Sequence, residues 1–149
     1  MFRGATKLAL DDKGRLAIPT RLRERLAERC AGNLVITVDK GPCLLIYPLP
    51  DWQEIEQQIM GLPNVRVELR RMQRLMVGYA TEVDIDGHGR ILLSPALRDF
   101  ARLDHKAILI GQGKKFELWD EKRWKKMGDA WLSTDDNGDL PPELESLSL

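Results

Sequence analysis

Apolar and polar positions follow the same order in both halves of the chain. In each half, a polar turn that contains glycine leads into a short apolar strand, and a helix with an apolar stripe at helical spacing follows. Two further apolar strands and a longer amphipathic helix complete the half. This order predicts one structural unit over residues 1–62 and a second over residues 80–132.

Turn residues and proline set the bounds of the predicted elements. Short strands are predicted in both units, over residues 15–18, 34–38, 44–47, 90–93, 107–110 and 116–119. Short helices are predicted to begin near Pro19 and Pro95, because proline fits the first turn of a helix. Longer helices are predicted after Asp51 and Asp120, and we expect these two carboxylates to act as N-caps.

The two units are also similar in sequence, and an internal repeat decides the architecture. Residues 11–23 (DDKGRLAIPTRLR) align with residues 86–98 (DGHGRILLSPALR), and Asp, Gly, Arg, Leu and Arg recur at the same places. A later block, residues 35–52, aligns with residues 107–124. One unit alone has too few strands to bury its apolar faces and leaves an unpaired edge. We therefore expect an α+β fold in which the two repeats interlock into one small β-barrel with flanking helices.

Two further segments join and follow the repeats. Residues 63–79 contain an amphipathic pattern over residues 67–77, which predicts a linking helix. Residues 133–149 contain Asp, Asn, Gly and a Pro-Pro pair, and we expect an acidic, flexible tail there.

The net charge of zero hides two regions of opposite sign. The chain of 149 residues contains 23 Lys and Arg and 23 Asp and Glu, which taken alone argues against a nucleic-acid partner. Residues 135–149 contain five acids and no base, so residues 1–134 carry a net charge of +5. The basic body is therefore compatible with a nucleic-acid partner.

Other classes of protein are excluded by what the sequence lacks. It has no apolar segment that predicts a signal peptide or a membrane helix, and we expect a cytoplasmic protein. Cys30 and Cys43 are too few for a disulfide framework and are typical of small apolar side chains in a reducing compartment. His88 and His105 match no metal-binding pattern, and no P-loop or nucleophile elbow is present. We therefore expect no enzyme, no metal and no cofactor.

A repeated Asp-x-x-x-Arg motif is the sharpest local feature. Asp11 and Arg15 bracket the first turn, and Asp86 and Arg90 bracket the second. One interpretation is structural, with the carboxylate capping the turn or pairing with the arginine. The other is that the motif faces a ligand, and the sequence leaves both open for the Asp residues. Each turn also contains a glycine where a positive φ is often needed, namely Gly14 and Gly89.

The first turn favours a ligand for its cations. Lys13 and Arg15 flank a glycine, so a tight turn presents both beside exposed backbone. Lysine binds phosphate, and arginine binds phosphate or the O6 and N7 atoms of guanine in a bidentate manner. Arg3 and Lys7 precede the turn on a predicted strand and are expected to extend the same positive surface. The other arginines of the first helix, Arg21, Arg23, Arg25 and Arg29, are typical of a solvated helix face.

Five motifs, in this order, resemble the MraZ family: MFRG (1–4), LDDKGR (10–15), YPLPDW (47–52), GYA (78–80) and DGHGR (86–90). The resemblance covers about residues 1–132. Members of that family are bacterial transcriptional regulators with two tandem AbrB-like (SpoVT-AbrB) domains. The resemblance implies a swapped-hairpin-like β-barrel and a ring-shaped homo-oligomer associated with the nucleoid. It also implies repression through short direct repeats in double-stranded DNA, upstream of the division and cell-wall gene cluster and of the regulator's own gene.

The family's motif falls on the two Asp-x-x-x-Arg segments of this chain. Its basic position is occupied by Lys13 in the first turn and by His88 in the second, so we expect the two repeats to contact DNA unequally. The predicted DNA-binding residues are Arg15, Lys13, Arg3, Lys7, Arg90 and His88, with Asp11, Gly14, Asp86 and Gly89 supporting the turns.

Two other functions remain open from the sequence. A protein-interaction module could use the basic face to hold an acidic partner, and its binding would depend on salt but not on DNA sequence. A small barrel enzyme for a phosphorylated ligand would instead need a pocket lined by arginine and backbone N–H groups.

Overall fold

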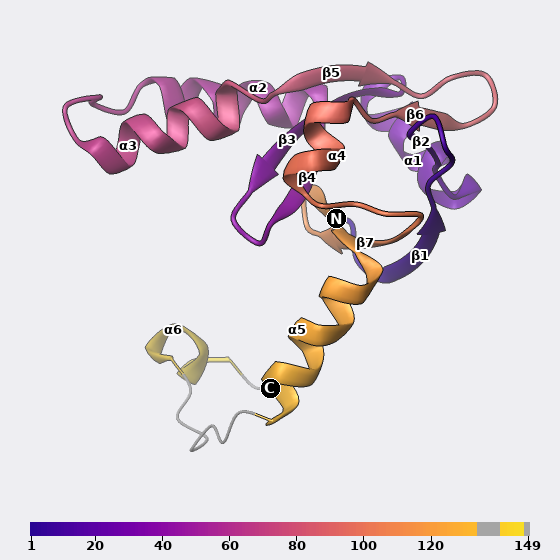
Figure 1. Cartoon of the computed structure of the whole chain (residues 1–149). Coiled ribbons are helices and arrows are strands. Elements are labelled where there is room, and N and C mark those ends of the chain that lie inside the picture. The colour runs from indigo at the N-terminus through magenta and orange to yellow at the C-terminus, as the bar shows by residue number, and fades with distance from the viewer. Residues whose placement is uncertain (134–140, 148–149) are drawn as a thin grey trace.

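The computed structural model describes residues 1–133 and 141–147, and it contains one large and one small antiparallel sheet (Figure 1). The strands of the large sheet are β1 (Ala5–Ala9), β3 (Asn33–Asp39), β4 (Cys43–Pro48), β5 (Thr81–Asp84), β7 (Lys106–Gln112) and β8 (Lys115–Asp120). Their order in the sheet is β1-β7-β8-β4-β3-β5. The small sheet pairs β2 (Arg15–Ala17) with β6 (Arg90–Leu92), and we call it the ribbon.

Helices connect the strands and surround the sheet. They are α1 (Thr20–Cys30), α2 (Leu49–Met60), α3 (Val67–Met72), the π-helix η1 (Gln73–Val77), α4 (Pro95–Phe100), α5 (Glu121–Ser133) and α6 (Pro142–Glu145). In Figure 1, α2 and α3 form an arm on one side of the sheet, and α5 projects away from it. The predicted flexible tail lies partly outside the described residues, since residues 134–140 and 148–149 are not among them.

The two repeats exchange strands, so neither repeat forms its sheet alone. The first strand of the chain, β1, pairs with β7 of the second repeat, with Ala5 opposite Ile110. In return β5 of the second repeat pairs with β3 of the first, with Leu34 opposite Val83. The strands β4 and β8 join the halves at the centre of the sheet.

The predicted closed barrel is wrong for the described residues. The large sheet is open, with β1 and β5 as its two edges. The strands β2 and β6 directly follow the edge strands β1 and β5 in the chain, but they pair with each other instead of bridging the edges. One isolated bridge, between Leu10 and Leu16, links the end of β1 to the ribbon. The interlocking of the repeats is therefore confirmed, whereas the predicted closure into a barrel is not.

Apolar side chains form one core on each face of the large sheet. Leu16 and Ile91 of the ribbon pack into the first core, together with Leu34 and Ile36 of β3. Trp52 of α2 packs into the second core, on the opposite face. The central strands β3 and β4 are buried on both faces, which explains their continuous apolar sequences.

One helix start and one helix type differ from the prediction. Helix α2 begins at Leu49, so Asp51 lies inside its first turn, where its buried carboxylate accepts a hydrogen bond from Arg29 (2.9 Å). Asp120 is an N-cap as predicted, because its carboxylate accepts the backbone N–H of Arg123 (3.3 Å). The linking helix covers the predicted range, but its second half is a π-helix, whose Met76 carbonyl accepts the hydroxyl of the buried Thr37.

Candidate nucleic-acid interface

The two Asp-x-x-x-Arg motifs meet in the ribbon. Arg15 pairs with Leu92, Leu16 with Ile91, and Ala17 with Arg90. This register is symmetric, because exchanging the two repeats reproduces the same three pairs. The turns that precede the two strands therefore lie at opposite ends of the ribbon, and each end carries one arginine.

The ribbon has an apolar inner face and a cationic outer face. Leu16 and Ile91 are buried against the first core. Successive side chains of a strand point to opposite faces, so both arginines lie on the outer face with Ala17 and Leu92. The side chains of Arg15 and Arg90 are 33% and 31% exposed, and Leu92 is 57% exposed. Two cations thus occupy one exposed face with only small or apolar side chains between them.

The first turn is built around Asp11. One carboxylate oxygen accepts the backbone N–H groups of Lys13 (3.0 Å) and Arg15 (2.8 Å). The other oxygen accepts the side-chain Nε–H of Arg15 (2.7 Å). A guanidinium group has five N–H donors, so this single bond orients Arg15 and leaves its outer nitrogens for another partner. The structural interpretation of the Asp and the ligand interpretation of the Arg are therefore compatible.

The second turn has the same backbone hydrogen bonds, but its arginine side chain lies farther from the aspartate. Asp86 accepts the backbone N–H groups of His88 (2.8 Å) and Arg90 (2.9 Å). The Nε atom of Arg90 lies 3.7 Å from the carboxylate, which is an ion pair but too long for a hydrogen bond. The backbone of both turns is thus equivalent, whereas the side chain of Arg90 is held less firmly than that of Arg15.

These hydrogen bonds lower the pKa of both carboxyl groups. Backbone and side-chain hydrogen bonds from Arg15 hold the pKa of Asp11 below its usual value. The backbone N–H of Arg90 lowers the pKa of Asp86 in the same way. Both turns are therefore stabilised by the ionised form of the aspartate.

Acid is expected to weaken the first turn. An aspartate with a lowered folded pKa stabilises the fold fully above its unfolded pKa of about 3.9, and it loses that contribution as the pH falls through the folded pKa. In urea unfolding between pH 3 and pH 7, Asp11→Asn should be less stable than the native chain at neutral pH. The difference should shrink below about pH 4. Asp99→Asn, on an exposed part of α4, serves as the matched control. A difference that does not vary with pH would contradict this role of Asp11.

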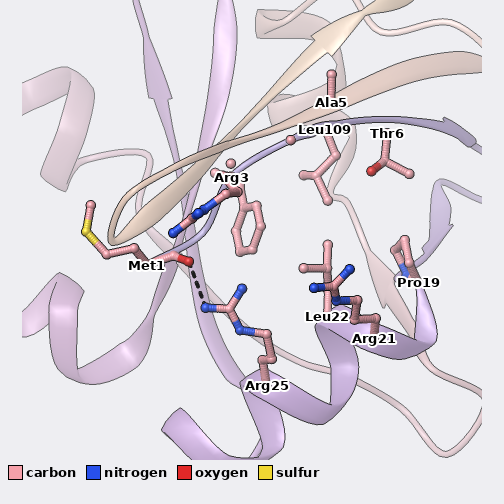
Figure 2. Close-up of a pocket in the computed structure, with 12 residues that line it drawn as sticks. Met1, Arg3, Ala5, Thr6, Pro19, Arg21, Leu22, Arg25 and Leu109 are labelled. Carbon is pink, nitrogen blue, oxygen red and sulfur yellow. Dashed lines mark hydrogen bonds between the residues drawn. The ribbon is translucent and has the colours of Figure 1, made fainter. Parts of the chain in front are cut away.

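Arg3 and Lys7 lie in two different depressions beside β1. Arg3 lines a depression of about 540 Å³ together with Arg21 and Arg25 of α1, and Figure 2 shows the three guanidinium groups around it. Arg25 also donates a hydrogen bond to the carbonyl of Met1 (2.7 Å). Lys7 lines a second depression, against α5. Each of the two predicted cations thus has its own neighbours on a separate helix.

Two arginines beside the turns were missed by the sequence prediction. Arg23 was assigned to a solvated helix face, but it is half-buried against the second turn. Arg98 received no role and is half-buried against the first turn. A signal was available, because both arginines recur at the same place in the aligned repeats.

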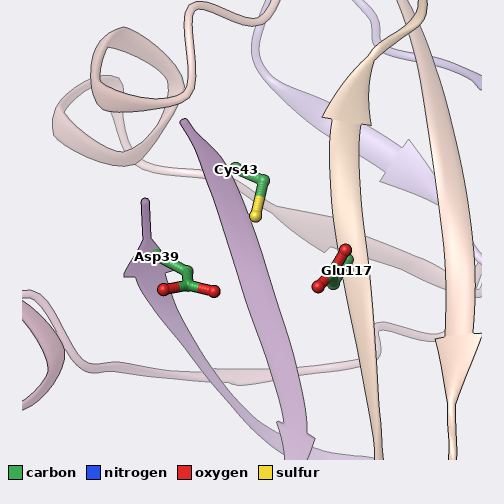
Figure 3. A group of neighbouring side chains, drawn as sticks. All are labelled: Asp39, Cys43 and Glu117. Carbon is green, nitrogen blue, oxygen red and sulfur yellow. The ribbon is translucent and has the colours of Figure 1, made fainter. Parts of the chain in front are cut away.

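Asp39, Cys43 and Glu117 form a cluster that could not be recognised from their spacing in the sequence. Their ligand atoms lie within 4.8 Å of one another across three strands (Figure 3). Burial raises the pKa of the Cys43 thiol to about 12, so the thiol stays protonated at neutral pH. Glu117 also accepts a hydrogen bond from the indole of Trp119 (2.9 Å). A metal ion binds the thiolate, so binding to this cluster would have to displace the proton of Cys43.

No helix within the described residues is long and apolar enough to span a membrane.

Comparison with known proteins gives consistent matches over the whole chain. The family model of the MraZ protein matches residues 1–75 and 76–135. The chain is 57% identical over 150 residues to the transcriptional regulator MraZ of Thioalkalivibrio sulfidiphilus, and 50% identical over 151 residues to that of Pseudomonas aeruginosa, with complete coverage of both chains in each case. It is 47% identical over 151 residues to that of Methylococcus capsulatus, with 99% of each chain covered. The relatives are regulators, which confirms the expectation that the chain is not an enzyme.

Proposed function

This chain belongs to the MraZ family of transcriptional regulators, and we propose that it binds double-stranded DNA through the outer face of the ribbon. The observation that carries the proposal is the pair of outward arginines, Arg15 and Arg90, on a two-stranded antiparallel ribbon. The major groove of B-DNA admits a ribbon of this width. The apolar inner face is anchored in the core, so only the arginine face is free to enter the groove.

The two arginines and the two turns have different roles in this proposal. Arg15 and Arg90 read guanine, because a guanidinium group makes two hydrogen bonds to O6 and N7. The exposed Lys13 and His88, one on each turn, bind the phosphates that flank the groove. Arg3 and Lys7 add phosphate contacts beside β1, each from its own depression. Arg15 reads more strongly than Arg90, since Asp11 orients its guanidinium group.

One protomer offers too few contacts for tight binding, so the proposal includes a ring-shaped homo-oligomer. Exposed apolar side chains on α5 and on the loop before α3 support contacts between copies: Trp131 is 60% exposed, Leu132 88% and Val65 81%. A ring presents several ribbons to successive direct repeats, so each bound ribbon raises the effective concentration of the next. The operators are the repeats upstream of the division and cell-wall gene cluster, including the regulator's own gene. Binding there, at the nucleoid, represses transcription.

A salt titration of DNA binding tests this function. Fluorescence anisotropy compares the DNA upstream of the chain's own gene with a scrambled sequence of the same length and composition. The upstream DNA should bind about a thousandfold more tightly or better, and the affinity for both should fall steeply as salt rises. Removing repeats one at a time should weaken binding stepwise. Equal affinity for both sequences would overturn the proposal and favour a protein-interaction module instead.

A further inference from the structure

Each turn of the ribbon rests on an arginine of the other repeat. Gly14 is buried with φ +85°, and a Cβ atom there would lie 2.7 Å from Nε of Arg98. Gly89 is buried with φ +76°, and a Cβ atom there would lie 2.6 Å from Cζ of Arg23. Ordinary contacts of a Cβ atom are longer than 3.4 Å, so in both places the guanidinium group occupies the space that a side chain would need.

Backbone hydrogen bonds cross between the repeats at the same two places. The N–H of Leu93 donates to the carbonyl of Gly14 (2.8 Å), and the N–H of Ile18 donates to the carbonyl of Gly89 (2.9 Å). Arg98 also donates its Nε–H to the carbonyl of Leu93 (3.2 Å). The guanidinium group of Arg98 thus lies against the first turn and is bonded to the residue that holds that turn.

We propose that Arg98 positions the turn of Lys13 and Arg15, and that Arg23 positions the turn of His88 and Arg90. The inference rests on the proposed function, because it concerns how those turns reach DNA. A flat guanidinium group fits against the bare Cα of a glycine. The guanidinium group thereby fixes the position of the turn relative to the strands of the ribbon, and it does so without contacting the nucleic acid. Each repeat therefore positions the reading arginine of the other.

The two positioning contacts are unequal. Arg98 is fixed by its bond to Leu93, whereas Arg23 donates to the hydroxyl of Thr20 (2.7 Å) through a terminal nitrogen. Within the described residues, the Nε atoms of Arg23 and Arg90 are buried without a hydrogen-bond partner. Arg23 is thus bonded to its own helix and not to the residue that holds the second turn, and this turn carries the looser of the two reading arginines. We therefore expect a larger loss of specific binding from Arg98→Ala than from Arg23→Ala.

Double-mutant cycles on operator binding separate positioning from direct contact. Arg98→Ala should reduce operator affinity about tenfold, and it should add little to the loss caused by Arg15→Ala, because it weakens the same reading contact that Arg15→Ala removes. Combined with Arg90→Ala, the two losses should multiply. Arg23→Ala should show the reverse pattern, with no further loss beside Arg90→Ala and a multiplied loss beside Arg15→Ala. If Arg98 contacts DNA itself, its loss will multiply with both reading arginines, and the inference is overturned.

Two further variants and a second measurement complete the test. Arg98→Lys keeps the charge but not the flat group, so it should lose operator affinity as Arg98→Ala does. The slope of affinity against salt should fall by no more than about one phosphate contact in both, because Lys13 is the one proposed phosphate-binding residue on the positioned turn. Arg102→Ala removes an exposed arginine just after α4 and should bind normally. Should Arg98→Ala unfold, the cycles are measured with Arg98→Lys, and native affinity in that variant overturns the inference.

The inference and the proposed function fail in different ways. If the native chain does not prefer its operator, or Arg15→Ala leaves that preference unchanged, the proposed function fails. If Arg15→Ala abolishes the preference but Arg98 and Arg23 do not follow the crossed pattern, only the positioning role fails.

Discussion

Replacing Arg15 with alanine is expected to abolish the preference for operator DNA while the chain stays folded. Each guanine contact supplies about 1–3 kcal/mol of discrimination, and in a ring the loss recurs at every bound ribbon. The fold is expected to persist because the pair with Asp11 is about one-third exposed, and ion pairs in contact with solvent contribute little to the free energy of unfolding. Anisotropy with operator and scrambled DNA measures the preference, and thermal unfolding measures the fold.

Two further variants show which property of Arg15 matters. Arg15→Lys keeps the charge without the bidentate geometry, so it should retain affinity for scrambled DNA and lose most of the preference. Arg90→Ala should reduce the preference less than Arg15→Ala, because its guanidinium group is not fixed by a hydrogen bond to Asp86. An Arg15→Ala variant that unfolds, or that keeps native operator affinity, would refute the assignment.

Neither repeat is expected to fold as a monomer when it is produced alone. A fragment of residues 1–79 lacks β5, which covers β3, and it lacks β7, the partner of β1. The first core also draws on both repeats, with Leu16 packed against Ile91 at its outer edge. The dispersion of amide signals in NMR spectra should be lost in each fragment and return when residues 1–79 and 80–149 are mixed.

A nicked chain provides the matched control for the fragments. Residues 61–66 form an exposed loop between α2 and α3, so one cut there breaks the chain without removing a strand. The nicked protein should keep its native spectrum and thermal transition, which shows that continuity of the chain is not the cause. Native-like spectra from a monomeric fragment of residues 1–79 would show that the exchanged strands are dispensable.

Local patterns predicted the elements better than they predicted how the elements meet. The strands over residues 34–38 and 44–47 were recognised because both are apolar on two faces and bounded by turn residues. The openness of the sheet depends on which distant strands pair at its edges, and the sequence of β1 or β5 contains no such information. Asp51 resembled an N-cap for a similar reason, because its partner Arg29 lies 22 positions away in the sequence.

In the candidate site, too, local features could be predicted from the sequence and contacts between distant residues could not. The proposed reading residues, Arg15 and Arg90, could be singled out from the sequence because the motif occurs twice and because lysine and arginine in a glycine turn have few purely structural uses. The spacing of Arg23 between apolar positions indicated a solvated helix face, since spacing describes only the helix to which a residue belongs. The surface that covers Arg23 is a turn of the other repeat, 66 positions later at Gly89. Residues that act across the repeats are therefore the ones that sequence patterns miss.

The near-symmetry of the ribbon determines whether a protomer can distinguish the two directions of a DNA duplex. A perfectly two-fold ribbon would fit a site equally well after a half turn and would suit palindromes. Here lysine stands at the tip of one turn and histidine at the other, and the two arginine–aspartate pairs differ, at 2.7 and 3.7 Å. In the proposed mode of binding, these differences give the protomer a polarity along the groove. A series of such protomers in the same orientation requires sites that all point the same way, which is what direct repeats provide.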